Sequence, residues 1–135
     1  MIAAFRRRTA VGLEVLGIYV RVRWLLLRRG TAPAVRILRQ GLQEQMGVDA
    51  ENVRVLRGLG SGRTVVRVLR LLPTDSRCLM RSLVLTRMLA RRGVYAKVVI
   101  GVRPQPSFGA HAWVEVDGHP VLATDESEYH RLVEL

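Results

Sequence analysis

The amino-acid sequence predicts an α+β domain: a helical N-terminal half, then a cysteine-bearing helix packed on a small antiparallel sheet. Three observations favour this fold. Apolar residues recur at helical spacing through residues 1–72, β-branched residues gather in residues 94–102, and Asp117-Gly118 separates two short apolar runs. A chain of 135 residues is long enough to bury one core. We therefore expect a single domain over residues 1–135, with a variable helical front (1–72) and a catalytic core (73–135).

The composition limits the classes of function. Lysine and arginine number 22 against 11 acidic residues, which gives a net charge of +11 and favours an acidic partner, an anionic surface or nucleic acid. Because the arginines are spread along the chain and aromatic residues make up only 5%, we expect no specific nucleic-acid site. The single cysteine cannot form an internal disulfide, which is typical of a cytoplasmic protein and leaves one free thiol to explain.

The N-terminal residues 1–29 predict one long helix that ends at Gly30, with much of its surface packed. Arg6-Arg7-Arg8 before an apolar stretch resembles the start of an export signal, but Glu14 interrupts that stretch. The longest charge-free run, residues 15–20, is far shorter than the ~20 residues of a membrane span. We expect no transmembrane segment, and a helix lying on a membrane surface is the alternative.

Three further helical runs are expected before the core. Pro33 suits the first turn of a helix that continues to Gly47. Gly58 and Gly60 are expected to break the next helical run. Ser61 is then expected to cap another run, which Pro73 ends.

The cysteine begins the next helix. Asp75 or Ser76 is a natural N-cap, which puts Cys78 in the first turn, and Gly93 ends the helix. There the unpaired backbone N–H groups and the helix dipole favour the thiolate, with Arg77 and Arg81 adding positive charge. The same N–H groups can stabilise the oxyanion that forms when a sulfur attacks a carbonyl.

Strands are expected after Gly93. Residues 94–102 predict a strand buried on both faces, and Asp117-Gly118 predicts a hairpin between residues 110–116 and 120–125. The tail, residues 126–135, is expected to form a helical turn or a packed arm.

The histidine of the first hairpin strand is the candidate base for the thiol. A lone histidine is usually structural, and we interpret His119 and His130 so. His111 lies between two alanines, which leaves its ring room to face a partner. Thiol catalysis needs such a base and a group that orients it. The spacing of cysteine and histidines does not suit zinc, so we expect no metal and no cofactor.

The orienting acid depends on the hairpin register. A three-residue turn places Asp125 opposite His111, within reach of a His–Asp hydrogen bond. A two-residue turn, which Asp-Gly favours, places Thr124 there instead. Pro120 makes a bulge after the turn plausible, so the register stays open. Because Asp117 belongs to the turn in either register, we assign Asp125.

Four segments together resemble the lasso-peptide leader peptidases, which belong to the transglutaminase-like superfamily of cysteine proteases with a papain-like core. The segments are Cys78-Leu79-Met80-Arg81-Ser82-Leu83, Leu89-Ala90-Arg91-Arg92-Gly93-Val94, Val99-Ile100-Gly101-Val102 and Phe108-Gly109-Ala110-His111-Ala112-Trp113-Val114-Glu115. The resemblance covers residues 73–125. It implies that Cys78 attacks the junction between leader and core of a ribosomally made precursor peptide, with His111 as base and Asp125 as its orienting acid.

The resemblance also implies partners. No segment resembles a leader-recognition domain, so a separate leader-recognition protein is expected, as in the stand-alone protease half of a split system. An ATP-dependent macrolactam cyclase would act after cleavage and is a further candidate partner. Three alternatives remain: an acyl transferase on the same scaffold, a non-catalytic binding module and a basic nucleic-acid-binding protein.

Overall fold

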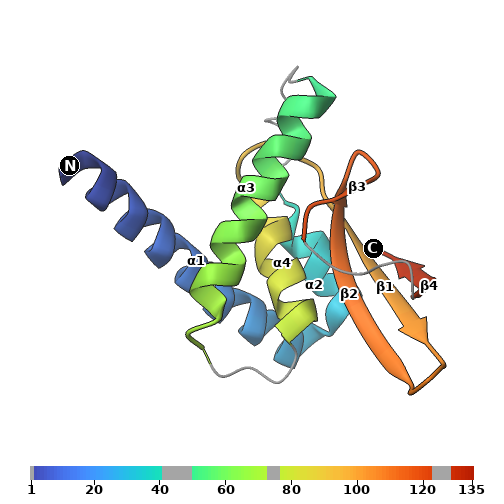
Figure 1. Cartoon of the computed structure of the whole chain (residues 1–135). Helices are drawn as coiled ribbons and strands as arrows, with labels where there is room; N and C mark the ends of the chain where they lie inside the picture. Colours follow the sequence, from blue (N-terminus) through green and yellow to red (C-terminus); the bar gives the residue numbers. More distant parts are fainter. Residues whose placement is uncertain (1, 41–49, 73–76, 123–128) are drawn as a thin grey trace.

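The computed structural model describes residues 2–40, 50–72, 77–122 and 129–135, which form a helical layer beside a small sheet (Figure 1). The elements are α1 (Ile2–Arg29), α2 (Thr31–Leu38), α3 (Glu51–Leu69), α4 (Arg77–Ala90), β1 (Lys97–Arg103), β2 (Gly109–Val116), β3 (His119–Pro120) and β4 (His130–Glu134). This arrangement confirms the predicted α+β fold.

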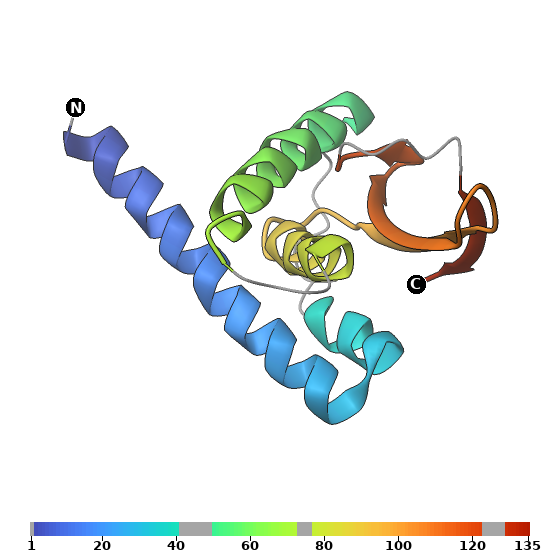
Figure 2. The ribbon, with the colours of Figure 1, turned by 60° about the horizontal axis from the view of Figure 1, so that its bottom comes forward.

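The cysteine-bearing helix α4 is the centre of the domain. It packs against α1, α2 and α3 on one side and against β1 and β2 on the other, as Figure 2 shows in a view near its axis. Leu83, Val84, Leu85 and Leu89 are fully buried. Neighbouring residues of a helix point in different directions, so these side chains make α4 apolar over most of its circumference. This is the pattern of a helix that other elements enclose.

The long N-terminal helix is confirmed, but less of its surface is packed than expected. α1 buries one stripe, made of Val15, Ile18, Val22 and Leu25, against α4 and its neighbours. The helix ends before Gly30, whose φ of 78° is the left-handed conformation that glycine adopts readily at such ends. None of the described helices is long and apolar enough to cross a membrane.

The expectation that glycines break the third helical segment is wrong. α3 runs without interruption through Gly58 and Gly60, and Ser61 is a buried residue inside the helix rather than its cap. The physical reason lies in the neighbouring hairpin. A Cβ atom at Gly58 would come within 2.7 Å of the Val121 side chain, and one at Gly62 within 2.4 Å of the Val121 carbonyl oxygen. Glycine therefore lets α3 and the hairpin approach closely, and this packing outweighs its low helix propensity.

Some expected helix boundaries lie outside the described residues. α2 begins at Thr31 and ends at Leu38, whereas the sequence pattern extends the helix to residue 46. Residues 41–49 are not described, and neither are the expected caps Asp75 and Ser76.

The sheet is antiparallel in the order β3-β2-β1-β4. The expected burial of the first strand on both faces is confirmed near its start, where Val98 and Val99 are fully buried. The hairpin turn has two residues, because Val116 pairs with His119, and Asp117 and Gly118 have φ values of 51° and 77°. Positive φ at both positions is the geometry of a type I′ turn.

The C-terminal tail forms a strand on the edge of the sheet, so of its two expected forms, a helical turn or a packed arm, the helical turn is wrong. β4 pairs with the free edge of β1, and Val98 and Leu135 exchange two backbone hydrogen bonds of 2.9 and 2.8 Å. Because this pairing joins residues far apart in the sequence, the pattern of neighbouring residues could not predict it. Within the described residues β3 covers only His119–Pro120, which is shorter than the expected strand at residues 120–125.

Candidate active site

Cys78 is the second residue of α4, as predicted, and its thiol is free and half-buried. The first N–H groups of a helix have no partner within it, so they and the positive end of the helix dipole lie beside the sulfur. Arg81 lies one turn further on the same side of the helix. This position offers backbone N–H groups to the oxyanion that forms when the sulfur attacks a carbonyl.

His111 lies near the start of β2 and is half-buried against aromatic rings. Its imidazole stacks on Trp113, with centroids 6.1 Å apart, and lies 5.3 Å from the ring of Tyr129. Burial lowers the pKa of His111, so the ring is neutral near pH 7 and able to accept a proton. Its Nε2 is buried and makes no hydrogen bond with any described residue.

The structure brings the two elements that carry Cys78 and His111 together. α4 packs against β2, and Figure 1 shows that α4 begins at the end of the domain where β2 begins. The side chains themselves are not joined. Val114 and Val116 pack in the helical core, so His111 and Trp113, at alternate positions, belong to the opposite face of β2. No hydrogen bond links His111 to Cys78 within the described part of the chain.

The expected third member, Asp125, lies outside the described residues. Of the two hairpin registers considered from the sequence, the described residues adopt the two-residue turn, and pairing extends to Glu115 and Pro120. Asp117 belongs to the turn and forms an ion pair of 2.8 Å with Arg54 of α3. The three-residue turn, from which Asp125 was expected opposite His111, is therefore wrong. Asp125 itself is not described, and its role stays a prediction.

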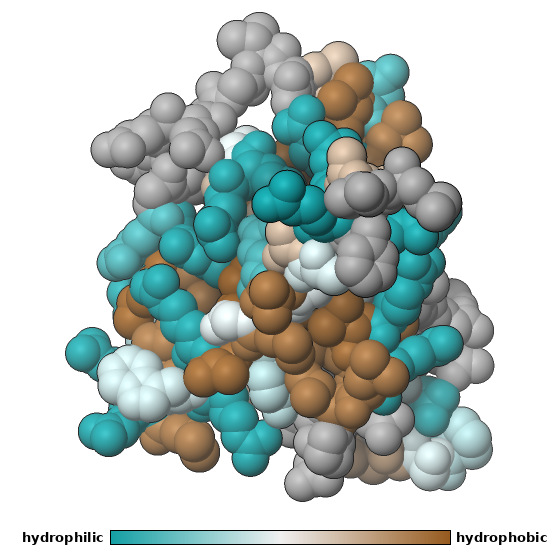
Figure 3. Space-filling view, turned by 90° about the vertical axis from the view of Figure 1, so that its left-hand side faces the viewer, coloured by the Kyte–Doolittle hydropathy of each residue, from teal (hydrophilic) through white to brown (hydrophobic). Residues whose placement is uncertain are grey.

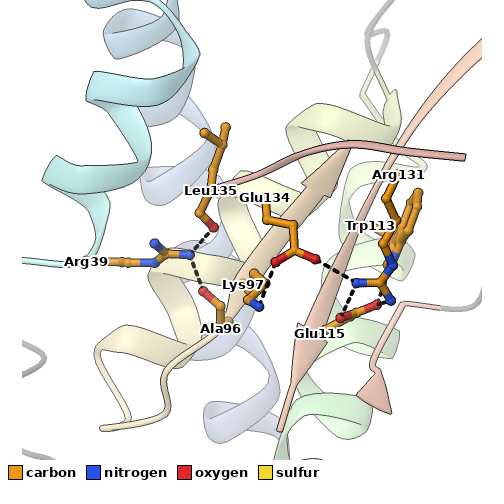
Figure 4. A network of polar contacts seen from close by, with 8 residues as sticks. All are labelled: Arg39, Ala96, Lys97, Trp113, Glu115, Arg131, Glu134 and Leu135. Atoms are coloured by element: carbon orange, nitrogen blue, oxygen red, sulfur yellow. Dashed lines mark hydrogen bonds and ion pairs between the residues drawn. The ribbon is translucent and has the colours of Figure 1, made fainter. Parts of the chain in front are cut away.

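The sequence analysis did not predict a polar network beside Trp113, the ring on which His111 stacks (Figure 4). Glu115 is only 4% exposed, and its carboxylate accepts hydrogen bonds from Trp113 Nε1 at 3.0 Å and from Arg131 at 2.6 and 3.2 Å. Arg131 also donates a hydrogen bond to Glu134. The hydrogen bonds to Glu115 and, second, to Glu134 raise the pKa of Arg131. A glutamate on the same face of the strand as His111 and Trp113 is the one sequence signal for this network.

The same network attaches the C-terminal strand to the body of the domain. Glu134 pairs with Lys97 at 2.8 Å, and this hydrogen bond lowers the pKa of Glu134. Arg39, just after α2, donates to the carbonyl oxygens of Ala96 and Leu135. β4 and the residue after it are therefore held by side chains of Arg39, β1 and β2 (Figure 4).

Gly101 makes room for the aromatic rings that surround His111. It is the pairing partner of His111 across β1 and β2. A Cβ atom at this position would lie 2.9 Å from two ring atoms of Trp113 and 3.0 Å from the Cβ of Tyr129. Only glycine therefore lets the indole lie flat over β1.

Two hollows in the described part of the molecule lie elsewhere. One is lined by Glu51, Asn52, Val55, Leu56 and His119, and the other lies between α1 and α4. Among the described residues, no three His, Cys, Asp or Glu side chains are grouped so as to hold a metal ion. Within these residues, Cys78 and His111 remain the groups suited to nucleophilic chemistry.

Two comparisons with known proteins found similarity to this chain. A segment of 46 residues, 34% of the chain, is 50% identical to the Microcin J25-processing protein McjB of Escherichia coli, of which it covers 22%. No solved structure matches the chain. The sequence model of the transglutaminase-like superfamily matches residues 16–134, which include Cys78 and His111. Because that match spans most of its length, the chain belongs to the transglutaminase-like superfamily.

Proposed function

We propose that this chain is a cysteine peptidase that removes the leader from a ribosomally made lasso-peptide precursor. The observation that carries the proposal is the free thiol of Cys78 in the first turn of α4, at the end of the domain where β2 carries His111. Membership of the transglutaminase-like superfamily and the identity to a microcin-processing protein support it.

The proposed chemistry follows from the groups present. His111 accepts the thiol proton, and the Cys78 sulfur attacks the carbonyl carbon at the junction of leader and core. The tetrahedral intermediate collapses to a thioester on Cys78 as His111 passes its proton to the leaving amine of the core. Water then cleaves the thioester and releases the leader as a carboxylate. Asp125 is the proposed acid that orients the imidazole.

This chemistry requires His111 to approach Cys78 more closely than in the unliganded chain. Catalytic hydrogen bonds are often long or misaligned without substrate and tighten in the complex. His111 belongs to the face of β2 away from α4 and stacks on Trp113, so the start of β2 must shift together with the ring for the two side chains to meet. We infer that precursor binding aligns the imidazole with the sulfur.

Two partners complete the proposal. A separate leader-recognition protein grips the leader and presents the junction to Cys78, which raises the effective concentration of the peptide at the site. The ATP-dependent macrolactam cyclase then closes the ring on the freed core amine.

Mass spectrometry of precursor incubated with the enzyme tests the proposal. We expect Cys78→Ala and His111→Ala to abolish leader release, since catalytic groups act as a unit. His119→Ala, at the exposed start of β3, is the matched control and should retain activity. Leader released as a free carboxylate indicates hydrolysis, whereas an amide at its new end indicates acyl transfer. Release by folded Cys78→Ala at the wild-type rate contradicts the peptidase assignment.

The acid is tested by a pair of conservative variants. Asp125→Asn should reduce cleavage by ~10²-fold or more, because the imidazole loses its orienting group. Asp117→Asn should retain most activity, since Asp117 pairs with Arg54 rather than with His111. The reverse order of activities would assign the role of Asp125 to Asp117.

A further inference from the structure

α1 carries a second apolar stripe on its solvent side. The exposed residues are Leu13, Leu16, Val20, Trp24 and Leu27, with exposed fractions between 38% and 79%. At 3.6 residues per turn, this stripe lies about 180° from the buried stripe of α1 and runs for about 20 Å. Figure 3, which looks on the side of α1 and α3, shows apolar patches among hydrophilic side chains. A surface helix normally has one apolar face, so the second one needs an explanation.

The exposed stripe is bordered by positive charge. α1 contains seven arginines and one acidic residue, Glu14. By helical geometry, Arg21 and Arg28 lie along one border of the stripe, and Arg23 lies along the other. Glu14 is already paired with Arg91 at 3.4 Å and Arg92 at 3.1 Å of the same chain. The borders of the stripe therefore favour a surface of opposite charge.

A hollow of ≈ 380 Å³ lies beside the stripe, between α1 and α4. It is lined by Leu13, Glu14, Gly17, Ile18, Arg21, Arg87 and Arg91. Burial lowers the pKa of Arg87, and the nearby charges of Arg21 and Arg91 lower it further. Three guanidinium groups thus face one carboxylate in this hollow, which makes it a favourable position for an added anion.

We propose that the stripe and the hollow together bind an acidic amphipathic helix of a partner protein. The apolar side of that helix would pack on Leu13, Val20 and Leu27, which recur every seven residues as in a helix–helix seam. One of its carboxylates would enter the hollow. A Cβ atom at Gly17 would meet nothing within 4 Å, so a partner helix can approach closely there.

Other occupants fit the surface less well. A second copy of the chain would bring the arginines of two α1 helices together, and like charges at an interface are unfavourable. A lipid surface would use the apolar stripe and the arginines but not the discrete hollow that contains Glu14. The proposal goes beyond the peptidase function, since neither Cys78 nor His111 contributes to this surface.

The test uses a synthetic helical peptide with a leucine seam flanked by glutamates, labelled for fluorescence anisotropy. We expect it to bind the full chain, and a peptide with lysines in place of the glutamates to bind at least ~10-fold more weakly. Val20→Asp and Arg21→Glu should each weaken binding of the acidic peptide by about 10-fold. The control variants are Arg63→Glu, on the exposed side of α3, and Leu71→Asp, at an exposed residue just after α3. Both make comparable changes and should leave binding unchanged.

Vesicles and the catalytic variant complete the test. Equal binding of the acidic and basic peptides, or binding unaffected by Val20→Asp, overturns the proposal. Binding to phosphatidylserine vesicles, but not to the acidic peptide, overturns it in favour of a membrane surface. Cys78→Ala should bind the peptide like the wild type, so failure of the peptidase function would not affect this result.

Discussion

The imidazole of His111 stacks on the indole of Trp113, with ring centroids 6.1 Å apart and planes inclined by 22°. Trp113 in turn donates a hydrogen bond to Glu115, and Glu115 is bound by Arg131 of the C-terminal strand. Three successive contacts therefore connect His111, the candidate base in β2, to Arg131 in the edge strand β4. Substitutions in this series of contacts should therefore change the position of the His111 ring and leave the reactivity of Cys78 unchanged.

Gly101→Ala should disturb the candidate base directly. The added methyl group would lie 2.9 Å from two ring atoms of Trp113, so the indole must move away from the position on which His111 stacks. We expect precursor cleavage to fall by about 10-fold or more, because small displacements of catalytic groups are costly. Alkylation of Cys78 by iodoacetamide should be unchanged. A changed near-ultraviolet circular dichroism spectrum with wild-type cleavage would contradict the positioning role.

The lowered pKa of His111 predicts a pH dependence of stability. The unfolded ring titrates near ~6.5, and burial lowers this pKa in the folded state. The unfolded chain therefore binds the proton more readily, so the free energy of unfolding is greatest above about pH 6.5. It should decrease as the pH falls from there through the folded-state pKa. Urea unfolding of the wild type and His111→Gln over this range should show the difference, and identical pH slopes would contradict it.

Arg131→Ala should destabilise the domain by leaving a buried carboxylate. Glu115 is 4% exposed, and Trp113 Nε1 would be the remaining donor of its described hydrogen bonds. An under-satisfied buried charge costs about 2–3 kcal/mol. Lys97→Ala removes an exposed ion pair with Glu134 and should have a smaller effect. Urea denaturation of both variants measures the difference. Equal losses would mean that Arg131 acts only as a surface charge.

Two glycines of α3 should respond oppositely to alanine. A Cβ atom at Gly60 meets nothing within 4 Å, so Gly60→Ala should raise the free energy of unfolding by about 0.5–1 kcal/mol. At Gly62 the Cβ would lie 2.4 Å from the Val121 carbonyl oxygen, so Gly62→Ala should lower it by about 1–3 kcal/mol. Thermal and urea unfolding provide the comparison. Stabilisation by Gly62→Ala would show that α3 and the hairpin do not pack so closely.

The sequence by itself determined the features that depend on neighbouring residues. Helical periodicity and Gly30 defined α1, and the apolar run before Gly93 defined α4 with Cys78 in its first turn. Asp117-Gly118 predicted the hairpin turn, because positive φ at both positions suits these two residues. Each of these features is set within a few residues, where propensity and capping act directly.

Only the tertiary structure decided the features that depend on distant segments. The glycines of α3 remain helical because Val121 packs against them, which outweighs a propensity of about 1 kcal/mol per glycine. The tail is a strand because β1 offers a free edge to it. His111 belongs to the face of Trp113 rather than that of α4 because the pleat of β2 places alternate residues on opposite sides. A local pattern reports none of these contacts, since each one is made by residues that only the folded chain brings together.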